Sequence, residues 1–151
     1  GLNKSDIDKP YKVGYIAGVF DLFHIGHLNM FKRAKEQCRY LIVGVVSDEG
    51  VRLNKQAEPF VPFDERIEMV RSCKYVDEAI KLPLDFCGTR DMFKIYHFDV
   101  QFSGSDYEHD PAWLAEKEFL EKNGSTMVFF PYTQSTSSTK LKRAIENRIN
   151  N

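Results

Sequence analysis

Cysteine is scarce in this chain, and neither sign of charge is in excess. The three cysteines among 151 residues, Cys38, Cys73 and Cys87, are odd in number and lack CxxC spacing, which argues against a disulfide framework and a structural zinc site. The 21 lysines and arginines nearly balance the 22 aspartates and glutamates. No bulk attraction to nucleic acid or to a membrane surface is therefore expected.

Long apolar runs, internal repeats and low-complexity segments are also absent from the sequence. The amino end, GLNKSDIDKPYK, is polar and has no features of a secretory signal. We therefore expect a cytoplasmic protein in a reducing compartment. Residues 1–11 are predicted to be flexible or introduced by cloning, and residues 12–151 to form one domain around a single core.

Strand-like and helix-like segments alternate along the chain. Strands are predicted at residues 12–19, 40–47, 77–83, 98–104 and 126–131. A first helix is predicted after the turn at residues 20–26, with Leu28, Phe31 and Ala34 on its buried face, and further helices at residues 63–76, 87–97, 111–124 and 139–149, with Asp64 as the N-cap of the second helix. The run YLIVGVVS at residues 40–47 is typical of a central parallel strand covered on both faces. The alternation predicts an α/β fold, a doubly wound Rossmann-like parallel sheet with helices on both faces.

Ligands of such sheets bind beyond the carboxyl ends of the strands, where loops lead into helices. Four loops qualify, namely residues 20–26, 48–62, 104–110 and 131–139. The second of them contains Gly50, Pro59 and Pro62 and is predicted to be a mobile loop over a site.

Two histidines, His24 and His27, begin the first predicted helix in the sequence HIGH. Their three-residue spacing places both rings on one side of the first turn, and Gly26 leaves room for close approach of a ligand. A helix amino terminus presents free N–H groups and the positive end of the dipole, so neutral imidazole N–H donors beside it can bind phosphate oxygens. HIGH therefore predicts a phosphate clamp.

Two other interpretations of the pair remain open on spacing alone. One histidine could cap the helix while the other packs, or the pair could bind zinc. A zinc site would need a third ligand, for which His97, His109 and Cys38 show no indicative spacing.

The stretch GVFDLFHIGH resembles the signature of the HxGH nucleotidyltransferase superfamily, and specifically the cytidylyltransferase pattern G-x-F-D-x-x-H-x-G-H. RYLIVGVVSDE, ERIEMVRSCKYVDEAI and GSDY continue the resemblance in order, between Lys12 and Ile145. The chain is most similar to small bacterial CTP:glycerol-3-phosphate cytidylyltransferases, and the same core occurs in choline-phosphate and ethanolamine-phosphate enzymes.

The resemblance implies three groups of site residues. The catalytic group is His24, His27 and Lys55, with Asn54 and Gln56 as neighbouring alternatives to the lysine. The nucleotide-binding group is Gly18, Val19, Phe20, Asp21, Gly26, Asp106, Thr133, Ser137, Ser138 and Thr139, and the acceptor-binding group is Arg66, Lys74 and Tyr132. For Asp21 a helix cap and for Asp106 an Asx turn are the structural alternatives.

The segment PYTQSTSSTK aligns with the family's second signature, R-T-x-G-I-S-T-T, and departs from it at two positions. Tyr132 stands in place of arginine and Ser135 in place of glycine. Tyrosine cannot replace the permanent charge of a bidentate arginine, although Lys140 or Lys142 could compensate. This departure bears on the identity of the phosphate-bearing acceptor more than on the reaction type.

The resemblance implies transfer of CMP from CTP to a small phosphorylated alcohol, with Mg²⁺ entering as the CTP complex and a homodimer formed through the first loop and CKYVDE. Glycerol-3-phosphate is the first expected acceptor, and phosphocholine or phosphoethanolamine are alternatives. TSSTKLKR also resembles the ISSTxxR signature of adenylyltransferases, which leaves ATP as an alternative nucleotide. A nucleotide-binding regulatory module without turnover is the non-enzymatic alternative.

Overall fold

The computed structural model describes residues 7–82, 88–131 and 138–150. Its strands are β1 (Tyr11–Gly18), β2 (Cys38–Val46), β3 (Glu78–Leu82), β4 (Val100–Gly104) and β5 (Met127–Phe130). Its helices are α2 (Ile25–Gln37), α3 (Asp48–Lys55), α4 (Phe63–Arg71), α5 (Thr89–Tyr96), α6 (Pro111–Lys122) and α7 (Ser138–Asn150), with a short 3-10 turn, η2 (Ser105–Tyr107). None of the helices in this described part is long and apolar enough to cross a membrane.

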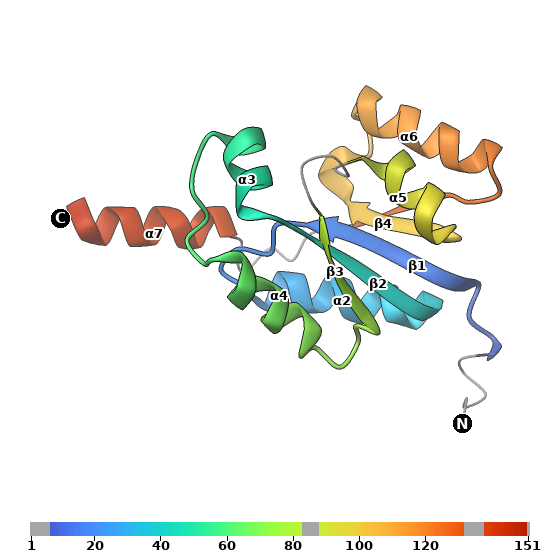
Figure 1. The fold of residues 1–151 in the computed structure, drawn as a ribbon, viewed down its shortest axis with the longest axis horizontal. Helices are drawn as coiled ribbons and strands as arrows, with labels where there is room; N and C mark the ends of the chain where they lie inside the picture. The colour runs from blue at the N-terminus through green and yellow to red at the C-terminus, as the bar shows by residue number, and fades with distance from the viewer. Residues whose placement is uncertain (1–6, 83–87, 132–137, 151) are drawn as a thin grey trace.

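The five strands form one parallel sheet in the order β3-β2-β1-β4-β5. Tyr15 in β1 pairs with Ile42 in β2 on one side and with Gln101 in β4 on the other. Helices cover both faces, with α2 and α4 on one and α5 and α6 on the other (Figure 1). The predicted doubly wound parallel fold is confirmed.

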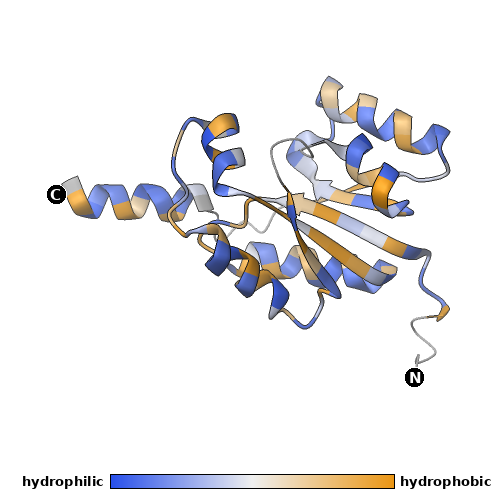
Figure 2. Ribbon diagram, viewed as in Figure 1, coloured by the Kyte–Doolittle hydropathy of each residue, from blue (hydrophilic) through white to orange (hydrophobic). Residues whose placement is uncertain are grey.

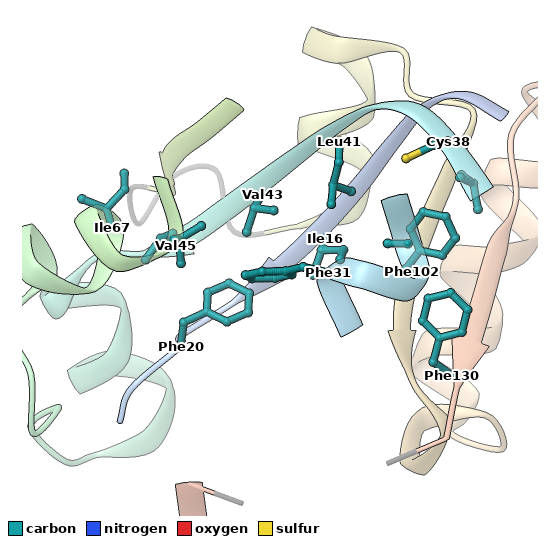
Figure 3. Close-up of a cluster of buried hydrophobic side chains, with 13 residues drawn as sticks. Ile16, Phe20, Phe31, Cys38, Leu41, Val43, Val45, Ile67, Phe102 and Phe130 are labelled. Carbon is teal, nitrogen blue, oxygen red and sulfur yellow. The ribbon is translucent and has the colours of Figure 1, made fainter. Parts of the chain in front are cut away.

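Alternation along the strands divides the core between the two faces of the sheet. Neighbouring residues of a strand point to opposite faces, so Ile16 belongs to the core under α2 and α4, whereas Tyr15 belongs to the core under α5 and α6. The first core contains Phe31 from α2 and Ile67 from α4, which pack on β1 and β2 (Figure 3). The strands are largely apolar, whereas the helices alternate apolar and polar residues (Figure 2).

Strand order reverses at β1, because the chain leaves β1 toward β2 and later returns to its other side with β4. A doubly wound sheet has its ligand crevice at such a switch point, outside the carboxyl ends of the strands. The loop after β1 and the turn η2 after β4 meet at this edge. Helix α7 extends from the same side of the molecule (Figure 1).

The prediction of a loop throughout residues 48–62 is wrong for its first half, which forms α3. Ser47 caps this helix by accepting the N–H of Gly50 at 3.1 Å, and Asp48 in the first turn favours the helix dipole. Asp64 is not an N-cap, because α4 begins one residue earlier, after Pro62. Gly50 suggests a loop in the sequence. In the structure a Cβ at this position would lie 2.7 Å from the side chain of Val46, so close packing of α3 against the end of β2 accounts for the glycine.

Candidate active site

The two histidines lie in the first turn of α2, directly after the carboxyl end of β1. His24 is the N-cap, and its Nδ1 accepts the backbone N–H of Gly26 at 3.0 Å. His27 accepts the backbone N–H of His24 on its own Nδ1 at 3.2 Å. The two ring centroids are 4.0 Å apart. The structure therefore brings the predicted pair of imidazoles side by side.

These hydrogen bonds fix the tautomer of each ring. A neutral imidazole has one donor and one acceptor nitrogen, so acceptance at Nδ1 places the proton on Nε2 in both histidines. Burial lowers the pKa of His24. Burial and the neighbouring His24 lower the pKa of His27 to about 3, although Asp21 opposes the shift. At neutral pH the pair offers two uncharged Nε2–H donors.

The two structural interpretations of the pair have different outcomes. The capping interpretation is confirmed for His24, but capping uses only Nδ1 and leaves Nε2 for a ligand. As for zinc, the described residues contain no group of three His, Cys, Asp or Glu side chains placed to hold a metal ion. Capping and phosphate binding are therefore compatible roles of the same residue.

Asp21, in the loop between β1 and α2, is a buried carboxylate with several partners. Its two oxygens accept the backbone N–H groups of Phe60 and Val61, each at 2.9 Å, and Nζ of Lys142 lies 3.0 Å from Oδ2. Burial raises the pKa of Asp21, but these donors and the lysine charge more than offset it, so the pKa lies below its ordinary value. Asp21 thus joins three segments, and its predicted nucleotide contact stays a prediction.

Arg66 lies beside the same loop, with its guanidinium buried and bonded to protein atoms. Nε donates to the carbonyl of Val61 at 2.8 Å, and Nη1 donates to the carbonyls of Val19 and Val46 at 2.7 and 2.8 Å. Nη2 donates to Oδ1 of Asp48 at 2.6 Å. The structure therefore places the predicted acceptor-binding arginine against the loop that leads to the histidines, with its donors directed at three carbonyl groups and the carboxylate of Asp48.

The residues before the histidines have packing roles in the structure. A Cβ on Gly18 would lie 2.7 Å from the ring of Phe20, which is buried against Phe31 with centroids 5.2 Å apart. The ring of Phe20 also lies edge-on to His27 at 5.4 Å. The predicted nucleotide contacts of Gly18, Val19 and Phe20 stay predictions.

Asp106 lies in η2, at the carboxyl end of β4 and therefore on the same edge of the sheet as the histidines. It is exposed, as is the neighbouring Tyr107, whose ring packs on Trp113 with centroids 4.5 Å apart. This placement suits the predicted role near the ribose, which stays a prediction.

Several predicted site residues lie wholly or partly outside the part of the chain that the structure describes. Tyr132, Thr133 and Ser137 lie outside the described residues, and so do the side chains of Ser138 and Lys55. Their backbones begin α7 and end α3, respectively, and Thr139 is exposed in the first turn of α7.

Lys74 is not brought together with the histidines within one chain. It lies between α4 and β3, hence at the amino end of a parallel strand, and its Nζ lies 5.3 Å from the ring centroid of Tyr75. The histidines follow the carboxyl end of β1, at the opposite edge of the sheet.

The sequence reasoning missed the partners that hold the site together. Asp48 carries a usable signal, because it is a carboxylate directly after the carboxyl end of a buried strand. No such signal marks Val61, because it takes part through its backbone N–H and carbonyl, which nearly every residue has.

Known proteins share both the sequence and the fold of this chain. A sequence profile described as "Cytidylyltransferase-like" matches residues 15–144. The lipopolysaccharide core biosynthesis protein of Thermoplasma volcanium has a similar structure, with a TM-score of 0.66 at 25% identity over 83% of this chain and 99% of that one.

Three curated relatives extend over most of the chain. The FAD synthase of Thermococcus kodakarensis is 36% identical over 139 residues, which are 89% of each chain. The ethanolamine-phosphate cytidylyltransferase of Dictyostelium discoideum is 34% identical over 91% of this chain but 39% of its own length. The glycerol-3-phosphate cytidylyltransferase of Bacillus subtilis is 32% identical over 85% of this chain and 92% of its own length. The chain therefore belongs to the cytidylyltransferase-like family of nucleotidyltransferases.

Proposed function

We propose that this nucleotidyltransferase transfers CMP from CTP to a small phosphorylated alcohol, with glycerol-3-phosphate as the first acceptor to test. The observation that carries the proposal is the pair of neutral Nε2–H donors of His24 and His27 at a helix amino terminus, at the switch point of the sheet. Phosphate oxygens are the ligands that such a terminus favours.

In the proposed reaction, an oxygen of the acceptor phosphate attacks the α-phosphorus of the nucleotide. A P–O bond forms there, and the bond from the α-phosphorus to the bridging oxygen breaks, so the electron pair leaves with pyrophosphate. A phosphate dianion is already nucleophilic at neutral pH, so no general base is required. The protein supplies alignment and donors for the developing negative charge, which we assign to Nε2 of His24 and His27.

The remaining phosphate contacts follow from the predicted residues. We assign Lys55 to the approaching and departing phosphates, and the start of α7 with Ser138 and Thr139 to the nucleotide phosphates. We propose that magnesium enters as the complex with the nucleotide triphosphate, as the resemblance implies.

The choice of acceptor is supported by the extent of the match. The chain spans 92% of the glycerol-3-phosphate cytidylyltransferase of B. subtilis, but less than two fifths of the D. discoideum ethanolamine-phosphate enzyme. Phosphoethanolamine and phosphocholine remain the alternative acceptors.

Transfer of AMP from ATP is the second candidate function. The FAD synthase of T. kodakarensis matches this chain over 89% of both lengths, and FAD contains an adenylyl group joined to flavin mononucleotide. On this alternative, flavin mononucleotide would be the phosphorylated acceptor and the chemistry at phosphorus would be unchanged.

We further propose that the chain pairs with a second copy, as the resemblance implies. An apolar pocket of about 430 Å³ opens where the first loop meets α4; its lining residues are Phe20, Leu22, Phe23, Val61, Glu65, Arg66, Glu68 and Met69. Met69 is 53% exposed at this opening. A dimer across this face would cover it, and light scattering with Met69→Glu tests the assignment.

The experiment that tests the function measures pyrophosphate release with magnesium. CTP and ATP are each combined with glycerol-3-phosphate, phosphocholine, phosphoethanolamine and flavin mononucleotide. Release with CTP and glycerol-3-phosphate is expected, whereas release with ATP and flavin mononucleotide alone would move the chain to the second function. His97→Asn serves as the control for His24→Ala, because His97 is exposed and precedes β4, at the opposite edge of the sheet, and asparagine tolerates its left-handed backbone.

A further inference from the structure

The main chain of Val61 is held on both sides of its Cα. Its N–H donates to Oδ1 of Asp21 at 2.9 Å, and its carbonyl accepts from Nε of Arg66 at 2.8 Å. Asp21 belongs to the loop that leads to the histidines, whereas Arg66 belongs to α4. The main chain of one residue, Val61, therefore connects the side chains of Asp21 and Arg66.

Arg66 also holds the loop directly, through the carbonyl of Val19 at 2.7 Å. Its side chain is fully buried, and its charge is balanced by Asp48 at 2.6 Å. A buried guanidinium that loses these partners would be left unpaired, which is costly. Arg66 is therefore unsuited to exchange its protein partners for a substrate during each turnover.

The loop between β1 and α2 has two residues in an unfavourable backbone conformation. Phe20 and Leu22 have φ angles of 57° and 51°, in the left-handed region that residues other than glycine seldom adopt. They flank Asp21 on either side, and His24 follows two residues after Leu22. Such conformations persist only where surrounding contacts impose them.

We propose that Arg66 is a positioning residue for the histidine pair, which acts with Asp21 through the main chain of Val61 to hold Phe20 and Leu22 in their left-handed conformations. The proposal assigns Arg66 no contact with the acceptor. The expected effect of Arg66 on turnover rests on the proposed function, whereas its expected effect on the histidine tautomers does not.

The consequence at the histidines follows from the geometry of α2. If the loop relaxes, the backbone N–H groups of His24 and Gly26 shift relative to the two Nδ1 atoms that they now meet at 3.2 and 3.0 Å. The Nδ1 atoms then lose the donors that keep the proton on Nε2. Loss of Arg66 should therefore change the tautomers of two rings that it does not touch.

The test compares Arg66→Lys with Arg71→Lys by nitrogen NMR of the unliganded protein. Arg71 is the matched control, because it lies on the same helix but is exposed and paired with Glu68. In the wild type and in Arg71→Lys, both histidines are expected as the Nε2–H tautomer. In Arg66→Lys, both are expected to show a mixture of tautomers, because lysine lacks the planar fork that reaches Val19 and Val61 together.

Turnover gives the second readout. For Arg66→Lys we expect kcat to fall by about 100-fold, as for a misplaced reacting group, with the KM of the acceptor changed by less than about threefold. A large rise in the acceptor KM with unaltered histidine spectra would overturn the proposal and favour an acceptor contact. If no substrate pair supports turnover in the wild type, the proposed function fails, but the histidine spectra still decide the positioning role.

A variant at the other partner of Val61, Asp21, covers the case in which Arg66→Lys does not fold. Asp21→Ala removes the acceptor of the Val61 N–H while Arg66 keeps its four bonds. Mixed histidine tautomers are expected here as well. Spectra identical to those of the wild type in a folded Asp21→Ala would overturn the proposal.

Discussion

Lys142 of α7 reaches the buried carboxylate of Asp21, with 3.0 Å between Nζ and Oδ2. The same ammonium lies 5.6 Å from the ring centroid of Phe60, whose backbone N–H also donates to Asp21. Three segments distant in sequence thus meet at one carboxylate, at the edge of the sheet where the histidines lie.

Removing this lysine charge should weaken the fold. In Lys142→Met the buried carboxylate keeps two backbone N–H donors but loses its cation, so we expect the free energy of unfolding to fall by about 1–3 kcal/mol. Urea unfolding at pH 7 measures the change. Lys142→Arg restores the charge and is expected to recover most of the loss; equal stability of Lys142→Met and the wild type would contradict a stabilising role for the pair.

His27 should make the stability of the fold fall at acidic pH. Its pKa in the fold is about 3, whereas an unfolded histidine takes up a proton near its ordinary pKa of about 6.5. Between these values the unfolded state binds more protons, so stability falls as the pH falls from about 6.5 toward 3. His27→Gln keeps an acceptor for the N–H of His24 but cannot titrate.

Unfolding at pH 7 and pH 5 measures this difference. The wild type is expected to lose about 1–2 kcal/mol more than His27→Gln between the two values, after allowance for partial solvent screening. An identical pH dependence in the two proteins would show that His27 titrates normally in the fold.

Two variants of His24 should separate capping from catalysis. Aspartate is a good N-cap, so His24→Asp keeps an acceptor for the first turn of α2, whereas His24→Ala loses it at a cost of about 1 kcal/mol. Both variants lose the Nε2–H donor and are expected to be slower by about 100- to 1000-fold. His24→Asp should be the slower one, because its charge repels phosphate.

Thermal melting and pyrophosphate release are measured on both variants. A stable His24→Asp with activity near that of the wild type would rule out the phosphate-binding role of His24. His97→Asn, at the opposite edge of the sheet, is the control in both assays.

Gly18→Ala should disturb the site by displacing the ring of Phe20. The added Cβ would lie 2.7 Å from Cζ of Phe20, so the ring must move away from its contacts with Phe31 and His27. We expect a loss of about 1–3 kcal/mol, typical of overpacking, with lower turnover. Gly124→Ala is not a suitable control because its φ is 84°; Gly88→Ala is preferable, because its Cβ would meet only Asp91, at an ordinary contact distance of 3.5 Å.

The sheet and the position of the histidines were predictable because each depends on a local pattern. A continuous apolar run such as residues 40–47 fits a strand covered on both faces, and HIGH follows a strand directly. Helix α3 was missed because Gly50 suggests a turn, although the glycine there makes room for Val46.

The interior of the site was not predictable in the same way. Arginine on a helix favours an exposed charge or a ligand contact, and nothing in DERIEM indicates that the guanidinium of Arg66 is buried on three carbonyl groups. Such bonds depend on where distant backbone segments meet in space. Lys142 was identified only as a replacement for a missing arginine, and its pairing with Asp21 follows from the packing of α7.

The hydrogen bonds on the two Nδ1 atoms come from the main chain of α2 itself. In many sites a carboxylate behind the ring decides which nitrogen carries the proton, and substitution of that carboxylate changes the chemistry. Here the residue at which the helix starts determines which nitrogen of each ring carries the proton. Side chains that contact the rings without holding the loop before α2 can therefore vary in charge and size without moving either proton, whereas a shift of the helix start by one residue would move both.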